Sequence, residues 1–263
     1  MVKERIGVIG CGEIGSAVIR SLIQKIDATN QPPKFEIVAY DVDKQKSSAF
    51  YGVTVAEEFP LGLEYYIICV WTTEQVINTL EQIIKGCKDP KLISIETTLD
   101  PNRLASLEYI YDDLPIAAFP HRLMPGDSEH QVFNLDRVLG GITKEVTKVA
   151  NDFYSNFMDK KLIHRTDFRT AALSKVLENA YRYCEIVIAQ EMSKVMEEAG
   201  FYFESVRQAA NTKWNCDIRR AEKGVLGKCL PKDFGFFFDT FGGGLFENIW
   251  MHNNCYIEAK KND

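Results

Sequence analysis

The sequence predicts an α/β protein in which a doubly wound parallel sheet is followed by a helical domain with one long helix. Two observations support this prediction. Short apolar runs alternate with helical patterns through the first half, whereas residues 170–199 contain neither proline nor glycine and repeat apolar residues at helical spacing. We place the domain boundary so that the sheet occupies residues 1–168 and the helical domain occupies residues 169–263.

Composition excludes several classes of function. The chain has 263 residues, 46% of them hydrophobic, which is enough for one large or two modest cores. A net charge of −6 and dispersed lysines and arginines argue against a nucleic-acid partner. The sequence shows no signal-like start and no membrane-length apolar run, and its 7 cysteines lack paired spacing. We therefore expect a cytoplasmic protein with no membrane association, disulfide framework or metal site.

The first strand leads into a glycine-rich turn. Ile6–Ile9 runs directly into Gly10-Cys11-Gly12-Glu13-Ile14-Gly15, and a helical pattern follows. Gly10 would make the tight turn, Gly12 would let a pyrophosphate approach the backbone, and Gly15 would let the helix pack closely on the sheet. With the phosphate at the helix N-terminus, this context predicts a Rossmann-like dinucleotide-binding domain.

The second strand ends at an acidic residue. Phe35–Tyr40 is followed by Asp41, whose carboxylate can accept bonds from ribose hydroxyls and would repel a 2′-phosphate. NAD is therefore preferred over NADP. Asp41 lies further along than usual, and an insertion at Asn30–Pro33 accounts for the difference. The alternative is that this aspartate merely closes a strand at a turn.

Three later apolar runs predict further parallel strands at 65–70, 92–95 and 115–119. Ligands of such sheets bind at the carboxyl ends of the strands. This rule points to the segments 70–73, 96–98 and 119–121, and hence to the candidate site residues Val70, Thr72, Thr98 and His121.

The long helix is expected from Thr170 to Ala199, ended by Gly200. Lys175 and Asn179 share one face of it and could together hold an oxyanion or a water. The alternative is a solvated helix face. A second helix is expected over 204–210.

The segment Gly224–Asp233 places Cys229 in a turn between lysines. Lys228 and Lys232 favour a thiolate, glycines allow close approach of a ligand, and Asp233 could position a water or a lysine. An ordinary, partly buried thiol is the alternative.

Four separated segments together resemble the UDP-glucose/GDP-mannose dehydrogenases. They are the glycine turn, Glu96-Thr97-Thr98, the stretch from Phe119 through Gly126 to Gly141, and Leu173–Asn179 with the later 210–213 and 227–233. The resemblance covers roughly residues 4 to 240. It implies that Cys229 attacks an aldehyde to give a thiohemiacetal and then a thioester. It also implies that Lys175 stabilises the alkoxide, that Asn179 and Thr98 hold a water, and that Asp233 supports the lysine or that water.

The sequence departs from the family pattern at two points. His121 stands where the family has a glutamate, so a different base is expected to assist proton transfer. The chain also stops about thirty residues after Asp233, whereas family enzymes continue into a further nucleotide-binding domain. Either the substrate is smaller, or another chain supplies the rest.

The tail from 234 to 263 is rich in aromatic residues, so we expect it to pack against a second copy in a homodimer, with docking within the chain as the alternative. The leading hypothesis is an NAD-dependent enzyme that oxidises an alcohol of a sugar or sugar nucleotide. Two alternatives stay open: an enzyme that uses another adenosine cofactor, such as the methyl donor S-adenosylmethionine, and a non-catalytic nucleotide-binding protein descended from a dehydrogenase.

Overall fold

The computed structural model describes residues 3–28, 34–48, 50–86, 89–124, 127, 129–221 and 224–261. The insertion at Asn30–Pro33, and Pro125 and Gly126 of the family-like stretch, lie outside the described residues. The chain divides into two compact units, Met1–Lys175 and Val176–Asp263, which are described separately below.

The first unit is built on one eight-stranded sheet in the order β3-β2-β1-β4-β5-β6-β7-β8. Its strands are β1 (Glu4–Ile9), β2 (Phe35–Tyr40), β3 (Thr54–Val55), β4 (Tyr65–Ile68), β5 (Leu92–Ile95), β6 (Ile116–Ala118), β7 (Arg137–Gly141) and β8 (Ile163–Asp167). The predicted doubly wound sheet is therefore confirmed. The expectation of an all-parallel sheet needs one correction, because β7 runs antiparallel to β6.

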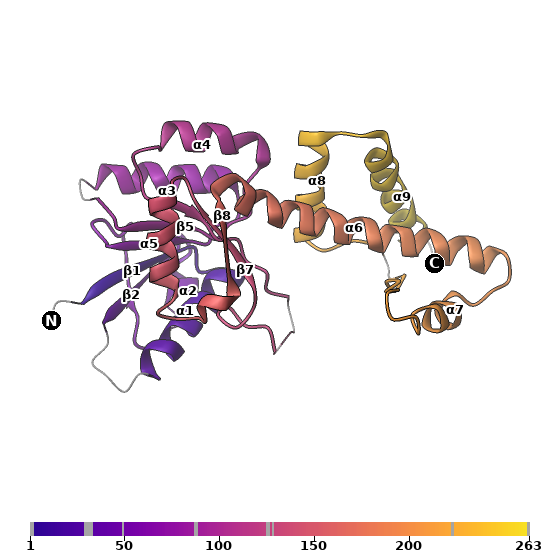
Figure 1. Cartoon of the computed structure of the whole chain (residues 1–263), viewed down its shortest axis with the longest axis horizontal. Helices are drawn as coiled ribbons and strands as arrows, with labels where there is room; N and C mark the ends of the chain where they lie inside the picture. Colours follow the sequence, from indigo (N-terminus) through magenta and orange to yellow (C-terminus); the bar gives the residue numbers. More distant parts are fainter. Residues whose placement is uncertain are drawn as a thin grey trace. The chain divides into compact units, whose positions relative to one another are not determined.

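Helices cover both faces of this sheet (Figure 1). Alternate side chains of each buried strand point to opposite faces. One face packs on α1 (Glu13–Asp27) and α5 (Lys144–Tyr154). The other packs on α3 (Thr73–Lys85), α4 (Leu104–Ile110) and the first turns of α6. The shorter elements are α2 (Lys44–Ser47), η1 (Pro101–Arg103) and η2 (Lys160–Leu162).

The chain order of the strands creates a switch point between β1 and β4. From β1 the chain builds β2 and β3 on one side, and it then crosses to β4 and β5 on the other. All the pairs among β1, β2, β4, β5 and β6 are parallel, so their carboxyl ends meet at one edge. Ligands of open α/β sheets bind at this kind of edge.

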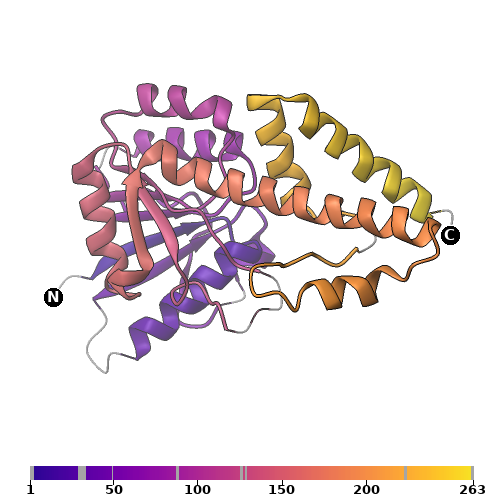
Figure 2. The ribbon, with the colours of Figure 1, turned by 45° about the vertical axis from the view of Figure 1, so that its right-hand side comes forward.

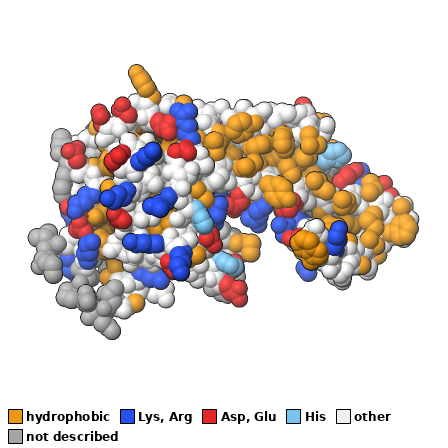
Figure 3. Space-filling view, in the orientation of Figure 1, with side chains coloured by type: hydrophobic (Ala, Val, Ile, Leu, Met, Phe, Trp, Pro, Cys, Tyr) orange, Lys and Arg blue, Asp and Glu red, His pale blue; other side chains and the backbone are white. Residues whose placement is uncertain are grey.

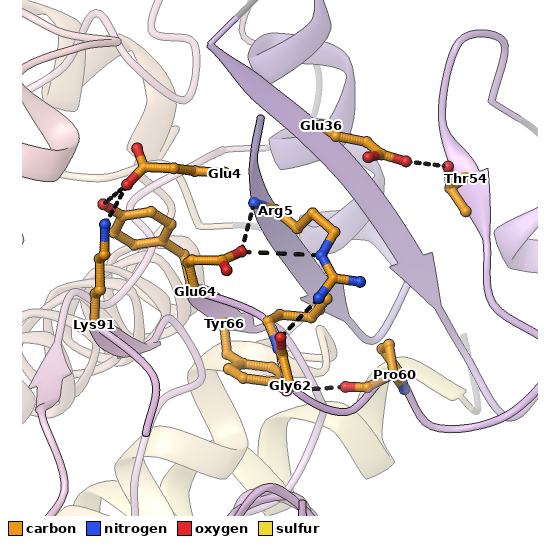
Figure 4. A network of polar contacts seen from close by, with 11 residues as sticks. Glu4, Arg5, Glu36, Thr54, Pro60, Gly62, Glu64, Tyr66 and Lys91 are labelled. Atoms are coloured by element: carbon orange, nitrogen blue, oxygen red, sulfur yellow. Dashed lines mark hydrogen bonds and ion pairs between the residues drawn. The ribbon is translucent and has the colours of Figure 1, made fainter. Parts of the chain in front are cut away.

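The opposite edge, where these strands begin, is tied by polar contacts (Figure 4). The Arg5 guanidinium donates to the carbonyl of Gly62 at 2.8 Å and lies 3.9 Å from a carboxylate oxygen of Glu64. Lys91 pairs with Glu4 across the same edge. These contacts link β1 to the segments that lead into β4 and β5. They lie at the edge of the sheet opposite the carboxyl ends of the strands.

The second unit is helical (Figure 2). The long helix α6 spans Phe168–Glu198 and runs on from the first unit, and it is followed by α7 (Phe203–Ala210), α8 (Cys229–Phe241) and α9 (Gly244–Lys261). Gly200 ends the long helix with φ +83°, as predicted from its position. Among the described helices, none is long and apolar enough to cross a membrane.

The core of the second unit is an aromatic stack. The ring of Phe234 lies 4.2 Å from that of Tyr183 and 5.8 Å from that of Trp250, and all three are nearly parallel. Phe237, Phe238 and Phe246 pack against this core. Much of the aromatic tail is therefore docked within its own chain, whereas Phe241, Leu245 and Met251 remain exposed.

Candidate active site

The glycine turn after β1 has the geometry that the sequence predicted. Gly10 adopts φ +91°, a left-handed conformation that favours glycine. A Cβ atom on Gly15 would stand 1.8 Å from the carbonyl oxygen of Gly10, so α1 can pack this closely only with glycine there. A Cβ atom on Gly12, in contrast, would meet nothing within 4 Å. The turn therefore leaves open space at the position where a pyrophosphate would approach.

Helix α1 begins immediately after this open position. Gly12 is its N-cap residue and has no side chain to cap the helix. The leading N–H groups, those of Glu13 and Ile14, are thus placed to bind an anion at the positive end of the helix dipole. The residues present at this turn fit a dinucleotide phosphate.

Asp41 lies next to this turn at the end of β2. Its Oδ2 atom accepts a hydrogen bond from the backbone N–H of Cys11 at 2.7 Å, and its Oδ1 atom accepts one from that of Asp43 at 2.9 Å. The carboxylate is buried and held in one orientation. Each oxygen keeps a second lone pair, so Asp41 can still accept bonds from a ribose.

The ends of β4 and β5 are fastened to each other at the same edge. The Thr97 hydroxyl donates to the carbonyl of Val70 at 2.8 Å, whereas the neighbouring Thr98 is partly exposed. Thr72 caps α3, because its hydroxyl accepts from the backbone N–H of Gln75 at 3.2 Å. The Thr72 side chain therefore caps a helix, a role that was not predicted from the sequence.

His121 belongs to a buried polar cluster at the carboxyl edge. Its Nε2 atom contacts Oε2 of Glu96, and the same oxygen lies 3.1 Å from Nη2 of Arg137. The Tyr154 hydroxyl on α5 donates to the other oxygen of Glu96 at 2.8 Å. The guanidinium of Arg137 also lies 3.7 Å from the centre of the Phe119 ring. We call Glu96, His121, Arg137 and Tyr154 the edge cluster.

The charges of the edge cluster follow from its burial. Burial alone would raise the pKa of Glu96, but Arg137 and the hydrogen bonds to the carboxylate lower it to about 2. Burial lowers the pKa of His121, and the positive charges of Arg137 and Lys175 lower it further against the opposing effect of Glu96. At neutral pH, Glu96 is therefore ionised and the His121 imidazole is neutral.

In the second unit, two of the predicted residues meet. The Asn179 side-chain amide donates to Oδ2 of Asp233 at 2.6 Å, and both residues are buried. Lys232 lies 2.9 Å from the other carboxylate oxygen. Lys175, one turn before Asn179 on α6, is also buried. The alternative of a solvated helix face therefore does not hold for these two residues.

Cys229 is exposed and is the first residue of α8. The predicted turn thus opens a helix, and a helix N-terminus favours a thiolate. The loop before it is anchored by α9, where Oδ1 of Asn253 accepts from the backbone N–H of Val225 at 2.9 Å. Gly224 adopts φ +99°, and a Cβ atom there would stand 2.4 Å from the Ile257 side chain.

Several contributors were not assigned a role from the sequence. Glu96 and Arg137 lie within the family-like segments, but no sequence pattern predicted that they cluster with His121. The clustering depends on which face of the sheet each side chain points to. Tyr154 and Asn253 carried no sequence signal, since each acts through a long-range contact.

Comparison with known proteins finds a family model that matches part of the chain. Residues 169–244 match the model described as the UDP-glucose/GDP-mannose dehydrogenase family, central domain. UDP-N-acetyl-D-mannosamine dehydrogenase of Methanocaldococcus jannaschii is 30% identical over 270 residues, covering 90% of this chain and 62% of that protein. The protein of the same name from Methanococcus maripaludis C7 is 31% identical over 172 residues, covering 65% of this chain and 40% of that protein. This chain thus spans about half the length of these relatives.

Solved structures share the fold. UDP-D-ManNAc dehydrogenase from Pyrococcus horikoshii superposes with a TM-score of 0.84 at 21% identity, covering 96% of this chain and 68% of that one. A 3-hydroxyisobutyrate dehydrogenase from Mycobacterium tuberculosis reaches 0.74 at 14% identity, with 98% of this chain and 94% of that one covered.

Proposed function

We propose that this chain, a member of the UDP-glucose/GDP-mannose dehydrogenase family, oxidises an alcohol of a nucleotide sugar with NAD as the hydride acceptor. The observation that carries the proposal is the buried Asn179 to Asp233 hydrogen bond, because it joins two family-motif residues within the matched segment. UDP-N-acetyl-D-mannosamine is the first substrate to test, since several relatives are named for it.

NAD would be held by the first unit. Gly10, Gly12 and Gly15 shape the turn, the N–H groups that open α1 face the phosphates, and Asp41 accepts from the ribose. Val70, Thr72 and Thr98 lie at the neighbouring strand ends. When bound, NAD accepts the hydride that leaves the carbon bearing the hydroxyl.

The chemistry would run in two oxidations. The first converts the alcohol to an aldehyde, and Lys175 stabilises the alkoxide. The Cys229 sulfur then adds to the aldehyde carbon, a second hydride leaves to a second NAD, and the resulting thioester is hydrolysed by water to the acid. Asn179 and Thr98 would hold that water, Asp233 would orient Asn179, and His121 would take the place of the family glutamate as the base.

Titration calorimetry tests the cofactor. We expect the unmodified protein to bind NAD more tightly than NADP, and Asp41→Asn to narrow the difference while keeping an acceptor for the turn. Losing the charge-assisted bonds should cost roughly 1.5–3 kcal/mol of NAD binding. Binding of S-adenosylmethionine with no binding of NAD would instead support a methyl-donor enzyme.

We further propose a homodimer formed through α6. Leu177, Tyr181, Ile188, Met192 and Val195 are all at least 42% exposed. At 3.6 residues per turn they fall within an arc of about 60° on the helix. Hydrophobic side chains also gather over α8 and α9 (Figure 3). An apolar stripe of this kind fits a second copy of itself.

Sedimentation equilibrium tests the dimer. Ile188→Glu should yield a monomer, whereas Tyr109→Glu, which changes a more exposed apolar residue on α4, should leave the dimer intact. A monomeric unmodified protein at micromolar concentration would contradict the proposal. We propose the reducing cytoplasm as its location, because no disulfide joins the six cysteines that the structure describes.

A further inference from the structure

Glu96, His121 and Arg137 meet because of strand alternation. Leu92 of β5 faces α1 and α5, and Glu96 has the same parity. Ala117 and Phe119 also face that side, which brings His121 next to Glu96. Arg137 opens β7 on this face and pairs with the same carboxylate. The sheet thus brings three members of the edge cluster together from three separate strand ends.

The cluster fixes which imidazole nitrogen of His121 carries the proton. An ionised carboxylate only accepts hydrogen bonds, so the nitrogen in contact with Glu96 must be the one bearing hydrogen. That nitrogen is Nε2. In a neutral imidazole the other nitrogen, Nδ1, then keeps a bare lone pair.

This Nδ1 atom is buried and has no hydrogen-bond partner among the described residues. The Nε and Nη1 atoms of Arg137 are likewise buried without a hydrogen-bond partner in that part of the chain. A buried acceptor without a partner is costly unless a ligand or water completes it. His121 follows β6 at the carboxyl edge, which it shares with the glycine turn.

We propose that Glu96 is a positioning residue that holds His121 with its proton on Nε2, so that Nδ1 is the base for the substrate hydroxyl. The inference rests on the proposed function and deepens it. In the first oxidation the C–H bond breaks and its hydride passes to NAD. The O–H bond breaks as well, its proton passes to Nδ1, and the carbon–oxygen double bond of the aldehyde forms. His121 becomes an imidazolium whose charge Glu96 stabilises.

The groups that face His121 set its response to pH. Glu96 from the end of β5 favours the proton, whereas Arg137 from β7 and Lys175 from α6 oppose it, and Tyr154 from α5 acts through Glu96. The rate of the first oxidation should therefore be flat above about pH 6.5, the ordinary value for histidine. It should fall only in more acidic solution.

The direct test is a nitrogen-15 NMR spectrum of the full chain labelled at histidine, with the His121 signals assigned by their loss in His121→Gln. We expect a protonated Nε2 and an unprotonated Nδ1 at neutral pH. Glu96→Gln can present its amide N–H to Nε2, so it should move the proton to Nδ1 and lower kcat roughly 100-fold, with the KM for NAD unchanged.

Tyr154→Phe is the matched control, because it removes another hydrogen bond to Glu96 without touching His121. It should keep the His121 proton on Nε2, which Glu96→Gln should not. A proton on Nδ1 in the unmodified protein would overturn the inference even if Glu96→Gln fails to fold, and so would wild-type kcat in Glu96→Gln. Absence of any NAD-dependent turnover would overturn the proposed function and, with it, the role of His121 as the base. The NMR spectrum shows separately which nitrogen of His121 carries the proton.

Discussion

Asn179 and Asp233 are 54 positions apart in the chain, yet the side-chain amide of the first donates to the carboxylate of the second at 2.6 Å in the core of the helical unit. Asp233 thereby fixes the orientation of the Asn179 amide. The contact also ties the long helix to α8, the helix that Cys229 opens.

A double-mutant cycle should measure this contact. Asn179→Ala leaves a buried carboxylate without one of its donors, and Asp233→Ala leaves a buried amide without an acceptor. We expect the two changes to be non-additive, with a coupling of about 1.5–3 kcal/mol in the free energy of unfolding. Urea denaturation of the two single variants and the double variant gives this value, and strict additivity would show that the pair is not coupled.

Two glycines of one turn should respond in opposite ways. Gly15→Ala should destabilise the fold, because its Cβ atom would stand 1.8 Å from a backbone oxygen. Gly12→Ala should leave the melting temperature nearly unchanged, because its Cβ atom meets open space, but should weaken NAD binding at least tenfold if the pyrophosphate lies there. Thermal melts and calorimetry separate the two effects. If a folded Gly12→Ala variant bound NAD with unchanged affinity, the pyrophosphate could not lie at this turn.

The buried histidine should make stability depend on pH. The pKa of His121 lies below its ordinary value near 6.5, so between those two values the unfolded chain binds more protons than the folded one. Stability therefore rises with pH through this window and is lost as pH falls. We expect His121→Gln to reduce the difference in melting temperature between about pH 5 and pH 7.5, relative to a matched change at the exposed His164. If His121→Gln left this difference in melting temperature unchanged, His121 would not be the source of the pH dependence.

Cys229 should be the first thiol to react. Cys229 and Cys255 are both exposed, but only Cys229 lies at a helix N-terminus, where a thiolate is favoured. Burial and the charge of Asp41 raise the pKa of Cys11 to about 11, which makes it unreactive. Limiting iodoacetamide followed by peptide mass spectrometry should show Cys229 labelled before Cys255. Earlier labelling of Cys255 would reduce Cys229 to an ordinary surface thiol.

Periodicity in the sequence predicted the elements whose side chains are buried on both sides. The runs at 35–40 and 92–95 coincide with β2 and β5, and the proline-free and glycine-free segment gave the long helix. In contrast, β8 was missed because three of its five residues are exposed and it has no apolar run. The strand β7 was missed because it begins with a buried arginine.

The candidate site could be predicted from the sequence only where all the residues that form one part of it lie in a single short segment. The glycine turn and the lysine-flanked cysteine are of this kind. The contact between His121 and Glu96 depends on two strand ends meeting on one sheet face, and the anchoring of the cysteine loop by Asn253 depends on how α9 packs. Neither relationship is encoded by spacing in the sequence.

The most direct test of the whole account is the amount of NADH formed from limiting UDP-N-acetyl-D-mannosamine, followed by absorbance. If the chain oxidises the alcohol to the acid through Cys229, each molecule of substrate should yield two molecules of NADH. Cys229→Ala should lose the second oxidation, because no thioester can form. A single NADH per substrate in the unmodified protein, or a yield of two that persists in Cys229→Ala, would contradict the account.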